Sequence, residues 1–348
     1  MSRSGPIVFR FDATPSLGVG HLQRCLALSS VLEARGCECH FFSHIENIRF
    51  QDHGKWVRLK AGEGNAGQLL EYSRAVGASG LVLDHYGVDE DYQQTLLPGG
   101  IPWLQFEGVP HQRLWARWVL AAGPGAFPEL YTPWLQSTET ELLLGPSYAI
   151  LRTDFLRIES RAFSCHEVRE VVVTFGGGWD RGGILLCLAT LSHWRERIRV
   201  HVLTTAANPS VPALQSWLMA HGLGWADLAL DAQDFPERLA SADLAIIAGG
   251  TTTFEAAHLG IPALIIQIAD NQKGQASALS RLGVAENLGP LESLDAGKLH
   301  RAVASIIDDS DKRKMMSEMG RALVDGQGVY RVVAELMKGP SSGKNAFT

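Results

Sequence analysis

The sequence lacks several features that mark common classes of protein. Its 348 residues contain no uncharged apolar run of about 18 residues, so the sequence predicts no transmembrane helix. The formal net charge is −6, which does not favour a nucleic-acid-binding protein. The first apolar run carries a charge and no small-residue cleavage site follows it, so we expect no secretory signal peptide and no stable membrane insertion.

Cysteine is scarce and shows no pairing pattern. The five cysteines are odd in number, no C-x-x-C pair occurs, and only Cys37 and Cys39 lie close together. Reduced thiols in a cytoplasmic protein fit this pattern best. His40 and His44 are near these cysteines but follow a strand pattern, so we predict no metal site there. The sequence also has no Walker A pattern and no G-x-S-x-G nucleophile elbow.

What the sequence does contain is a repeated alternation of strand and helix patterns. Hydrophobic residues make up 46% of the chain, which is ample for two cores, and domains usually have roughly 100–200 residues. Strands that alternate with helices predict parallel sheets covered on both faces. The predicted strands cover residues 7–11, 37–42, 81–84, 101–106, 118–122, 170–175, 198–204, 243–248 and 261–267. The predicted helices cover residues 21–35, 251–260, 272–282 and most of 292–337.

We therefore predict an α/β protein with two Rossmann-like, doubly wound parallel-sheet domains that face each other across a cleft. The charged segment 155–168 separates the two patterns, so the first domain is expected to cover residues 1–160 and the second 161–338. Residues 339–348 are polar and rich in Gly and Ser, which predicts a flexible tail. Ligands of such domains bind at the C-terminal ends of the strands, so the site is expected between the domains.

The first half places glycines and titratable residues after its first predicted strand. Gly18 and Gly20 lie in the turn between this strand and a helix, where free backbone N–H groups can face an anion. His21 begins the helix and is a candidate acid or base. Asp12 directly follows the strand and is close enough in sequence to orient the histidine ring. Each residue also has an ordinary explanation, as a turn glycine, a surface histidine or a turn carboxylate.

A second polar cluster stands at an equivalent place in the first half. Asp84, His85 and Tyr86 are consecutive and end another buried strand. The C-terminal ends of parallel strands meet at one edge of a sheet, so we expect this cluster to face the same cleft as the first one. Any one of the three side chains could be a turn residue, but the repetition favours a functional interpretation.

The second half contains two glycine-rich segments, each between a strand and a helix. They contribute the candidate binding residues Gly176, Gly177, Gly249, Gly250, Thr251 and Thr252. Their N–H and hydroxyl groups suit a diphosphate. Glu255 lies one helical turn further on and could accept hydrogen bonds from both hydroxyls of a ribose, or simply complement the helix dipole. Asn271 and Gln272 follow the next strand as candidate ligands or simple caps.

Five segments, in order along most of the chain, resemble a known family. They read FRFDATPSLGVGHLQRCLALSSVL, LVLDHYG, GPSYAILRTDF, VVVTFGGGWD and AGGTTTFEAAHLGIPALIIQIADNQ. These segments resemble the UDP-sugar hydrolases of bacterial pseudaminic acid biosynthesis, which have the two-domain GT-B fold. That family is similar to the lipid-II N-acetylglucosaminyltransferase of peptidoglycan synthesis. The resemblance implies hydrolysis of UDP-2,4-diacetamido-2,4,6-trideoxy-β-L-altropyranose, with inversion at the anomeric carbon and without a metal or other cofactor.

The resemblance also implies roles for particular residues. His21 matches the histidine proposed to activate the attacking water, and Tyr86 matches the tyrosine of a D-H-Y-G motif near the sugar. Asn271 matches an asparagine of the facing domain. Gly249–Thr252 and Glu255 match the UDP-binding segment. The implied partners are the UDP-sugar and UDP, with no nucleic acid, and the oligomeric state is not predicted.

Three segments depart from the family pattern and leave the identity of the sugar open. Phe106-Glu107-Gly108 stands where the family usually has two aspartates, residues 121–127 lack an asparagine-containing stretch, and Trp179 replaces a threonine. Two other functions stay open. One is a GT-B glycosyltransferase that passes the sugar to an acceptor, for which segment 114–120 hints at an acceptor or membrane-facing patch. The other is a catalytically silent partner that binds a nucleotide sugar.

Overall fold

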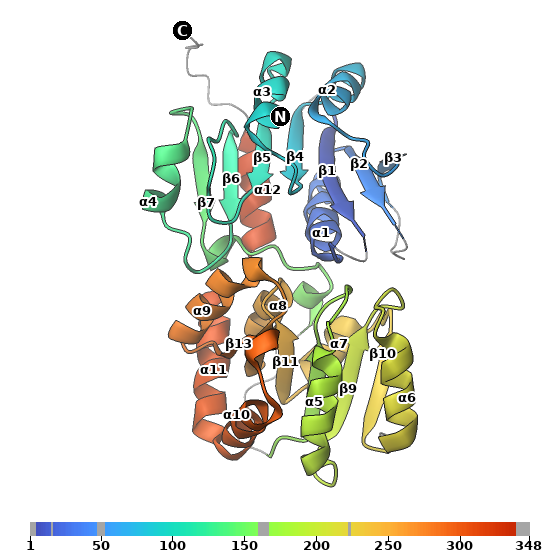
Figure 1. The fold of residues 1–348 in the computed structure, drawn as a ribbon. Coiled ribbons are helices and arrows are strands. Elements are labelled where there is room, and N and C mark those ends of the chain that lie inside the picture. Colours follow the sequence, from blue (N-terminus) through green and yellow to red (C-terminus); the bar gives the residue numbers. More distant parts are fainter. Residues whose placement is uncertain (1–4, 15–16, 47–52, 159–166, 222–223, 339–348) are drawn as a thin grey trace.

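The structure, a computed structural model, describes residues 5–14, 17–46, 53–158, 167–221 and 224–338. Two halves are stacked end to end, and each is built on one sheet with helices on both faces (Figure 1). Every pair of neighbouring strands within the two sheets is parallel. The predicted α/β class, with two doubly wound parallel sheets, is therefore confirmed. The predicted tail, 339–348, lies outside the described residues.

The first half is built on a seven-stranded sheet with the order β3-β2-β1-β4-β5-β6-β7. Its strands are β1 (Ile7–Ala13), β2 (Cys39–Ile45), β3 (Lys55–Arg58), β4 (Gly80–Asp84), β5 (Trp103–Phe106), β6 (Trp118–Ala121) and β7 (Glu141–Leu144). Its helices include α1 (Gly20–Ala34), α2 (Ala66–Ala75), α3 (Glu90–Leu96) and α4 (Pro128–Tyr131). Chain order reverses between β1 and β4, which is where a doubly wound sheet opens a crevice for ligands.

The second half repeats this plan in a six-stranded sheet with the order β10-β9-β8-β11-β12-β13. Its strands are β8 (Glu170–Thr174), β9 (Arg199–Thr204), β10 (Ala226–Leu230), β11 (Leu244–Ala248), β12 (Ala263–Gln267) and β13 (Ala285–Pro290). Its helices include α5 (Gly183–Leu191), α6 (Val211–His221), α7 (Phe235–Ser241), α8 (Thr252–Leu259), α9 (Lys273–Arg281), α10 (Ala296–Asp308) and α11 (Ser310–Leu323). Its crevice lies between β8 and β11.

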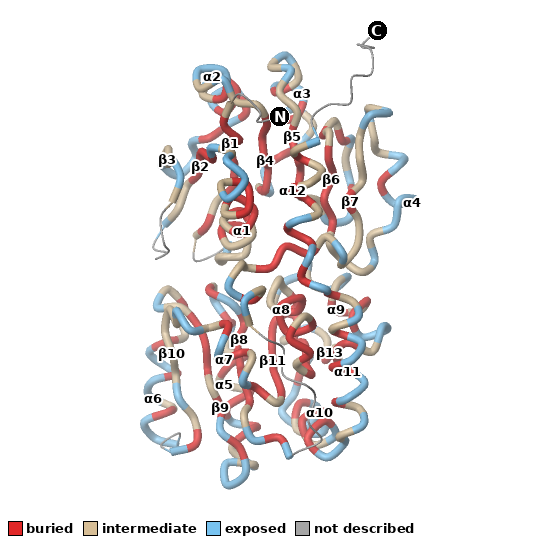
Figure 2. Tube along the Cα trace, turned by 180° about the vertical axis from the view of Figure 1, so that it is seen from behind, coloured by how far each residue is buried: buried red, intermediate tan, exposed pale blue. Residues whose placement is uncertain are grey.

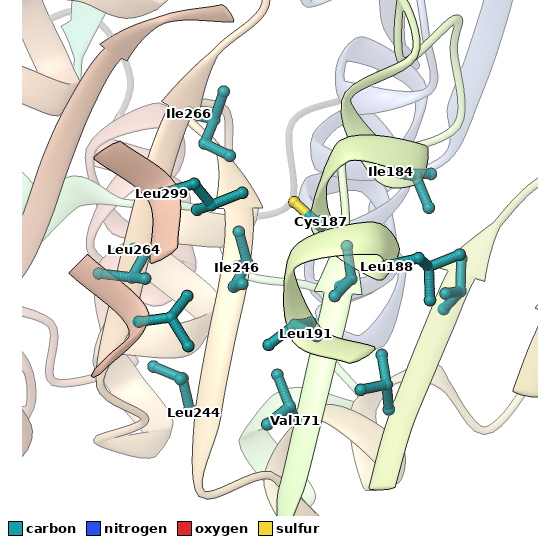
Figure 3. Close-up of a cluster of buried hydrophobic side chains, with 14 of the residues drawn as sticks. Val171, Ile184, Cys187, Leu188, Leu191, Leu244, Ile246, Leu264, Ile266 and Leu299 are labelled. Carbon is teal, nitrogen blue, oxygen red and sulfur yellow. The ribbon is translucent and has the colours of Figure 1, made fainter. Parts of the chain in front are cut away.

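Hydrophobic spacing explains how the helices attach to the sheets. On α5, the apolar residues Ile184, Cys187, Leu188 and Leu191 recur at the spacing of one helical face and are all buried. Figure 3 shows them beside side chains of the central strands and of α10. The strands β11 and β12 are buried along their whole length, because helices cover both faces of the sheet.

The strands that the sequence patterns do not predict are the edge strands of the two sheets. They are β3, β7, β10 and β13. Their residues are mostly half-buried or exposed, and the edge strand β10 is visibly paler than the central strands in Figure 2. A strand with little buried surface needs no continuous apolar run, so the hydrophobic pattern does not mark β3, β10 or β13, and the run in β7 is only three leucines long.

The last helix, α12 (Gly328–Lys338), corrects the predicted domain boundary. We expected residues 161–338 to form the second half, but α12 packs on α1 in the first half (Figure 1). Its apolar face, Val329, Val332, Val333 and Leu336, is buried in the same core as Phe9 and Leu28. The chain also enters the core of the second half early, at Ala149 and Leu151. Two segments therefore cross between the halves, near residues 149 and 325.

Candidate active site

The central feature of the site is a buried histidine at the start of α1 that is hydrogen-bonded to a carboxylate. His21 Nδ1 lies 2.6 Å from Asp84 Oδ1, at the end of β4. Arg24, one turn further along α1, donates to both oxygens of the same carboxylate from Nε and Nη2. Since an ionised carboxylate only accepts, His21 carries its proton on Nδ1 and donates it to Asp84. The other ring nitrogen, Nε2, then keeps a lone pair, and no described side chain hydrogen-bonds to it.

The charge state of Asp84 follows from its surroundings. Its side chain is 2% exposed. Burial by itself raises the pKa of the Asp84 carboxyl, but the opposite charge of Arg24 and the contact with His21 outweigh burial and hold that pKa well below its usual range. Asp84 is therefore a carboxylate beneath the histidine, and it stabilises an imidazolium should His21 take a second proton.

Asp12 does not orient His21, and this prediction is wrong. Along β1, Phe9 and Phe11 face the core beside α1, whereas Val8 faces the core on the other side of the sheet. Asp12 has the parity of Val8, so its side chain points away from α1. Asp84 shares the parity of Val82, which does face α1, and this places it under the histidine.

Asp12 instead anchors the turn that follows β4. It is paired with the buried Arg10, and its Oδ2 lies 2.9 Å from His85 Nε2. Burial raises the pKa of Asp12, but hydrogen bonds from His85 and Arg10 lower it well below its usual range. His85 Nδ1 accepts from the Gly87 N–H at 3.0 Å, so Nε2 carries the ring proton. Both ring nitrogens of His85 are thus engaged in holding this turn.

The turn presents Tyr86 between the halves. Its ring lies edge-on to the His21 ring, with centroids 4.8 Å apart. The Tyr86 hydroxyl accepts a hydrogen bond from Asn271 Nδ2 of the second half at 3.0 Å. The residue is nevertheless 67% exposed, so a ligand can reach this contact. The structure therefore brings together His21, Tyr86 and Asn271, which come from three different strand ends.

The glycine turn before α1 lies against the second half. Gly18 has a φ of +78°, which favours glycine. A Cβ at Gly177 would lie 3.1 Å from the methyl groups of Val19, and a Cβ at Gly20 would lie 4.0 Å from Thr251 Oγ1. Gly177 thus lets the two halves approach each other at Val19, two residues before His21, whereas a Cβ at Gly20 would make an ordinary van der Waals contact and one at Gly18 would meet open space. We expected Gly18 and Gly20 to make room for a ligand, and this stays a prediction.

Backbone N–H groups stand at the start of α8, across from the glycine turn, since a Cβ at Gly20 would lie 4.0 Å from Thr251 Oγ1. Helix α8 begins just after Gly249, Gly250 and Thr251, and the first N–H groups of a helix have no partner within it. The Thr251 side chain makes no capping hydrogen bond. Gln272 Oε1 instead accepts from the Gly249 and Ile268 N–H groups, at 3.3 and 2.9 Å, so it shapes the segment. The N–H groups of residues 250–252 stay free, among the described residues, for an anion.

Glu255 is less exposed than we expected for a residue that contacts a ribose. It is 4% exposed, and Arg152 Nε and Nη2 donate to its two oxygens at 2.7 and 2.9 Å. Arg152 lies inside one of the segments that resemble the hydrolase family, but no spacing or strand end marks it as a candidate. Arg10 was missed for the same reason. Arg24 could have been found, because it lies three residues after His21 on the same helical face.

Two further expectations concern surfaces and metals. Segment 114–120, the hint of an acceptor patch, is largely buried: Leu114, Ala116 and Trp118 are at most 1% exposed. Among the described residues, no three His, Cys, Asp or Glu side chains are grouped so that they could hold a metal ion. Within the same residues, every helix is too short or too polar to cross a membrane.

Sequence relatives are distant, and no family model matches the chain. The spore coat polysaccharide biosynthesis protein SpsG of Bacillus subtilis is 26% identical over 200 residues, which is 57% of this chain and 58% of that protein. The uncharacterised protein MJ1062 of Methanocaldococcus jannaschii is 21% identical over 263 residues, 73% of this chain and 54% of that protein. The matched region thus spans a little over half the length of each of these two relatives. A UDP-N-acetylglucosamine–N-acetylmuramyl-(pentapeptide) pyrophosphoryl-undecaprenol N-acetylglucosamine transferase of Methylorubrum extorquens is 32% identical over 94 residues, 26% of each chain.

Solved structures resemble the whole chain. MurG of Acinetobacter baumannii matches 96% of this chain and 99% of its own, with a TM-score of 0.64 and 15% identity. The UDP complex of MnaA from S. aureus matches 99% of this chain and 100% of its own, with a TM-score of 0.70 and 12% identity. At these identities the likeness is one of fold. It confirms the predicted GT-B architecture.

Proposed function

We propose that this protein hydrolyses a UDP-linked sugar at the anomeric carbon, with inversion, and releases UDP and the free sugar. The substrate we propose is the diacetamido-trideoxy sugar nucleotide of pseudaminic-type nonulosonic acid biosynthesis. The observation that carries the proposal is the His21–Asp84 pair, which leaves Nε2 without a hydrogen bond from any described side chain. The His21 ring lies beside Tyr86, whose hydroxyl contacts the second half. SpsG, named for polysaccharide biosynthesis, and the transferase, named for a UDP-sugar donor, support this substrate class.

In the proposed reaction, the first half activates the water and the second half holds the leaving group. A water oxygen attacks the anomeric carbon from the face opposite the diphosphate, and its proton passes to His21 Nε2. The bond between the anomeric carbon and the diphosphate oxygen breaks, and UDP leaves with the bonding electrons. Because attack and departure occur on opposite faces, the configuration inverts. Asp84, ionised below the ring, stabilises the imidazolium that forms.

The leaving group needs stabilisation of negative charge rather than a proton. The free N–H groups of residues 250–252, at the positive end of the α8 dipole, suit the diphosphate. The glycine segment at Gly176 and Gly177 borders the same junction, because Gly177 approaches Val19. Tyr86 and Asn271, joined across the halves, then border the sugar. We propose that no metal or other cofactor takes part.

Nuclear magnetic resonance of the purified protein with UDP-2,4-diacetamido-2,4,6-trideoxy-β-L-altropyranose tests the proposal. Phosphorus spectra are expected to show UDP appearing without any acceptor, and proton spectra taken early are expected to show the free sugar in the inverted configuration. Retention of configuration, or no release of UDP, would contradict the mechanism.

Transfer to an acceptor is the second candidate function. One observation favours it: Val109, Phe127 and Leu130 are exposed apolar side chains in the loops after β5 and β6 and on α4. Such side chains could receive an apolar acceptor. Release of UDP that begins only when an acceptor alcohol is added, in the same spectra, would establish transfer instead of hydrolysis.

A further inference from the structure

Arg152 makes a two-point contact with a buried carboxylate outside the His21 cluster. It lies in the segment that crosses from the first half to the second, between Leu151, buried in the second core, and Phe155. Its Nε and Nη2 donate to Glu255 Oε1 and Oε2 at 2.7 and 2.9 Å, which is the parallel, two-point geometry that a guanidinium makes with a carboxylate. The side chain of Glu255 is only 5% exposed and that of Arg152 22%.

Aromatic rings hold the guanidinium in this orientation. Its central carbon lies 4.8 Å from the centroid of the Phe155 ring and 4.4 Å from that of Phe235. The two rings lie edge to face, 6.1 Å apart. The crossing segment itself is fixed by close packing, since a Cβ at Gly328 would come within 2.1 Å of the Ala149 carbonyl oxygen. Arg152 therefore has little freedom to leave Glu255.

We infer that Arg152 is a positioning residue for nucleotide recognition: it fixes the Glu255 carboxylate so that the carboxylate receives the two hydroxyls of the ribose. The inference rests on the proposed function, in which UDP binds this half. A carboxylate offers about four acceptor sites, and the guanidinium uses one on each oxygen. One site on each oxygen is left, which matches the two neighbouring donors of a ribose.

Electrostatics gives Arg152 a second task. A carboxylate as buried as Glu255 is costly without an opposite charge, and breaking such a pair leaves an uncompensated charge. The pair also stands one helical turn from the free N–H groups of residues 250–252. The same helix thus offers donors for the diphosphate and oriented acceptors for the ribose. A lysine at position 152 would keep the charge but lose the two-point geometry.

The test compares UDP with 2′-deoxyuridine diphosphate, because only a role at the ribose changes the ratio of the two affinities. Calorimetric titration is performed on the wild-type protein, Arg152→Met and Arg152→Lys. The matched control is Arg157→Met, since Arg157 lies in the same crossing segment with an 81% exposed side chain. Wild type is expected to bind UDP about tenfold or more tightly than the deoxy analogue, the scale of a hydrogen bond to a charged group.

Arg152→Met is expected to lose most of this preference by weakening UDP alone, Arg152→Lys to keep part of it, and Arg157→Met to keep all of it. An unchanged preference in Arg152→Met, or tighter UDP binding because Arg152 competes with the ribose, overturns the inference while the proposed function stands. If the wild-type protein does not bind UDP, the proposed function falls and the inference falls with it. If it binds UDP and the deoxy analogue equally well, the ribose assignment and the inference are overturned while UDP binding stands. If thermal melting shows that Arg152→Met is unfolded, Arg152→Lys decides by the same ratio.

Discussion

The two halves share one plan of strands but furnish the site with different chemistry. Both sheets have the same strand order around the switch point, the place where chain order reverses. The order is β3-β2-β1-β4-β5-β6 in one sheet and β10-β9-β8-β11-β12-β13 in the other. In the first half, charged side chains fill the switch point, in the networks around Asp84 and Asp12. In the second half, glycines, threonines and backbone N–H groups occupy the corresponding place.

In the proposed mechanism, this difference gives the two halves different tasks. A group that moves protons must be a side chain, and the buried carboxylate that supports His21, Asp84, is balanced by Arg24. A group that only holds an anion can be the backbone itself, provided that no Cβ blocks the approach. We therefore expect substitutions in the first half to change turnover, and substitutions in the second half to change nucleotide affinity.

The largest effect is expected for His21→Asn. Loss of the general base lowers kcat by roughly 10²–10⁴-fold, whereas UDP affinity, set by the other half, stays close to that of wild type. Release of UDP at saturating substrate and calorimetric titration with UDP measure the two quantities. The control is His221→Asn, an exposed histidine at the end of α6. Near-normal turnover in His21→Asn would mean that the histidine is only a helix-start residue and that the two halves do not have separate roles in catalysis and nucleotide binding.

Asp84→Asn is expected to come next, and to exceed Asp12→Asn in its effect on kcat. The first substitution removes the charge that supports the His21 imidazolium and leaves Arg24 without its partner. The free energy of unfolding should fall by at most about 3 kcal/mol, since Arg24 is partly exposed. Asp12→Asn acts only through the turn that carries Tyr86. Urea denaturation and kcat on both variants check the order, and the reverse order would restore Asp12 as the residue that orients the ring.

Glu255→Ala is expected to weaken UDP by about 1–3 kcal/mol and to leave kcat at saturating substrate largely unchanged. The physical reason is that the ribose hydroxyls and Arg152 both lose their acceptor. Titration calorimetry measures the affinity, with Glu237→Ala as the control, because Glu237 is an exposed glutamate in the first turn of α7. Unchanged affinity would remove Glu255 from the nucleotide site.

The Asp84 network also predicts how stability depends on pH. The pKa of Asp84 is lowered in the folded protein, so its contribution to stability is complete above the ordinary carboxyl pKa of about 3.9 and is lost as the pH falls through the lowered folded value. Urea denaturation between pH 7 and pH 3 should therefore show a smaller decline for Asp84→Asn than for wild type. Parallel declines would mean that Asp84 is not ionised beneath His21.

Sequence patterns predicted the central strands but not the whole domain plan. Continuous apolar runs such as those of β11 and β12 mark strands that are buried on both faces. The edge strand β10 has no such run, and nothing local indicates that α12 returns to the first half, because an amphipathic helix fits either core. Long-range packing decides both cases.

Several candidate site residues could be predicted from the sequence. Some of the contacts between them could also have been predicted. His21, Asp84 and Tyr86 were candidates because polar residues follow strand ends. The alternation of side chains along β1 and β4 already implies that Asp84, not Asp12, faces α1, since apolar neighbours of the same parity share its side of the sheet. The Arg152–Glu255 pair joins residues 103 positions apart, and no periodicity relates them.

The smallest effect is expected from a chelator. This prediction tests whether backbone groups of the second half hold the diphosphate. If backbone N–H groups at the start of α8 balance the diphosphate, then no divalent cation is required there, and release of UDP should be the same with and without EDTA. Mg²⁺ prefers carboxylate ligands. The described residues near this helix start offer hydroxyl and N–H groups rather than a cluster of carboxylates. The measurement is the initial rate after dialysis against EDTA, followed by addition of Mg²⁺ or Mn²⁺. A loss of rate that either ion restores would mean that metal, not backbone, holds the diphosphate, and the two halves would then differ less than their side chains indicate.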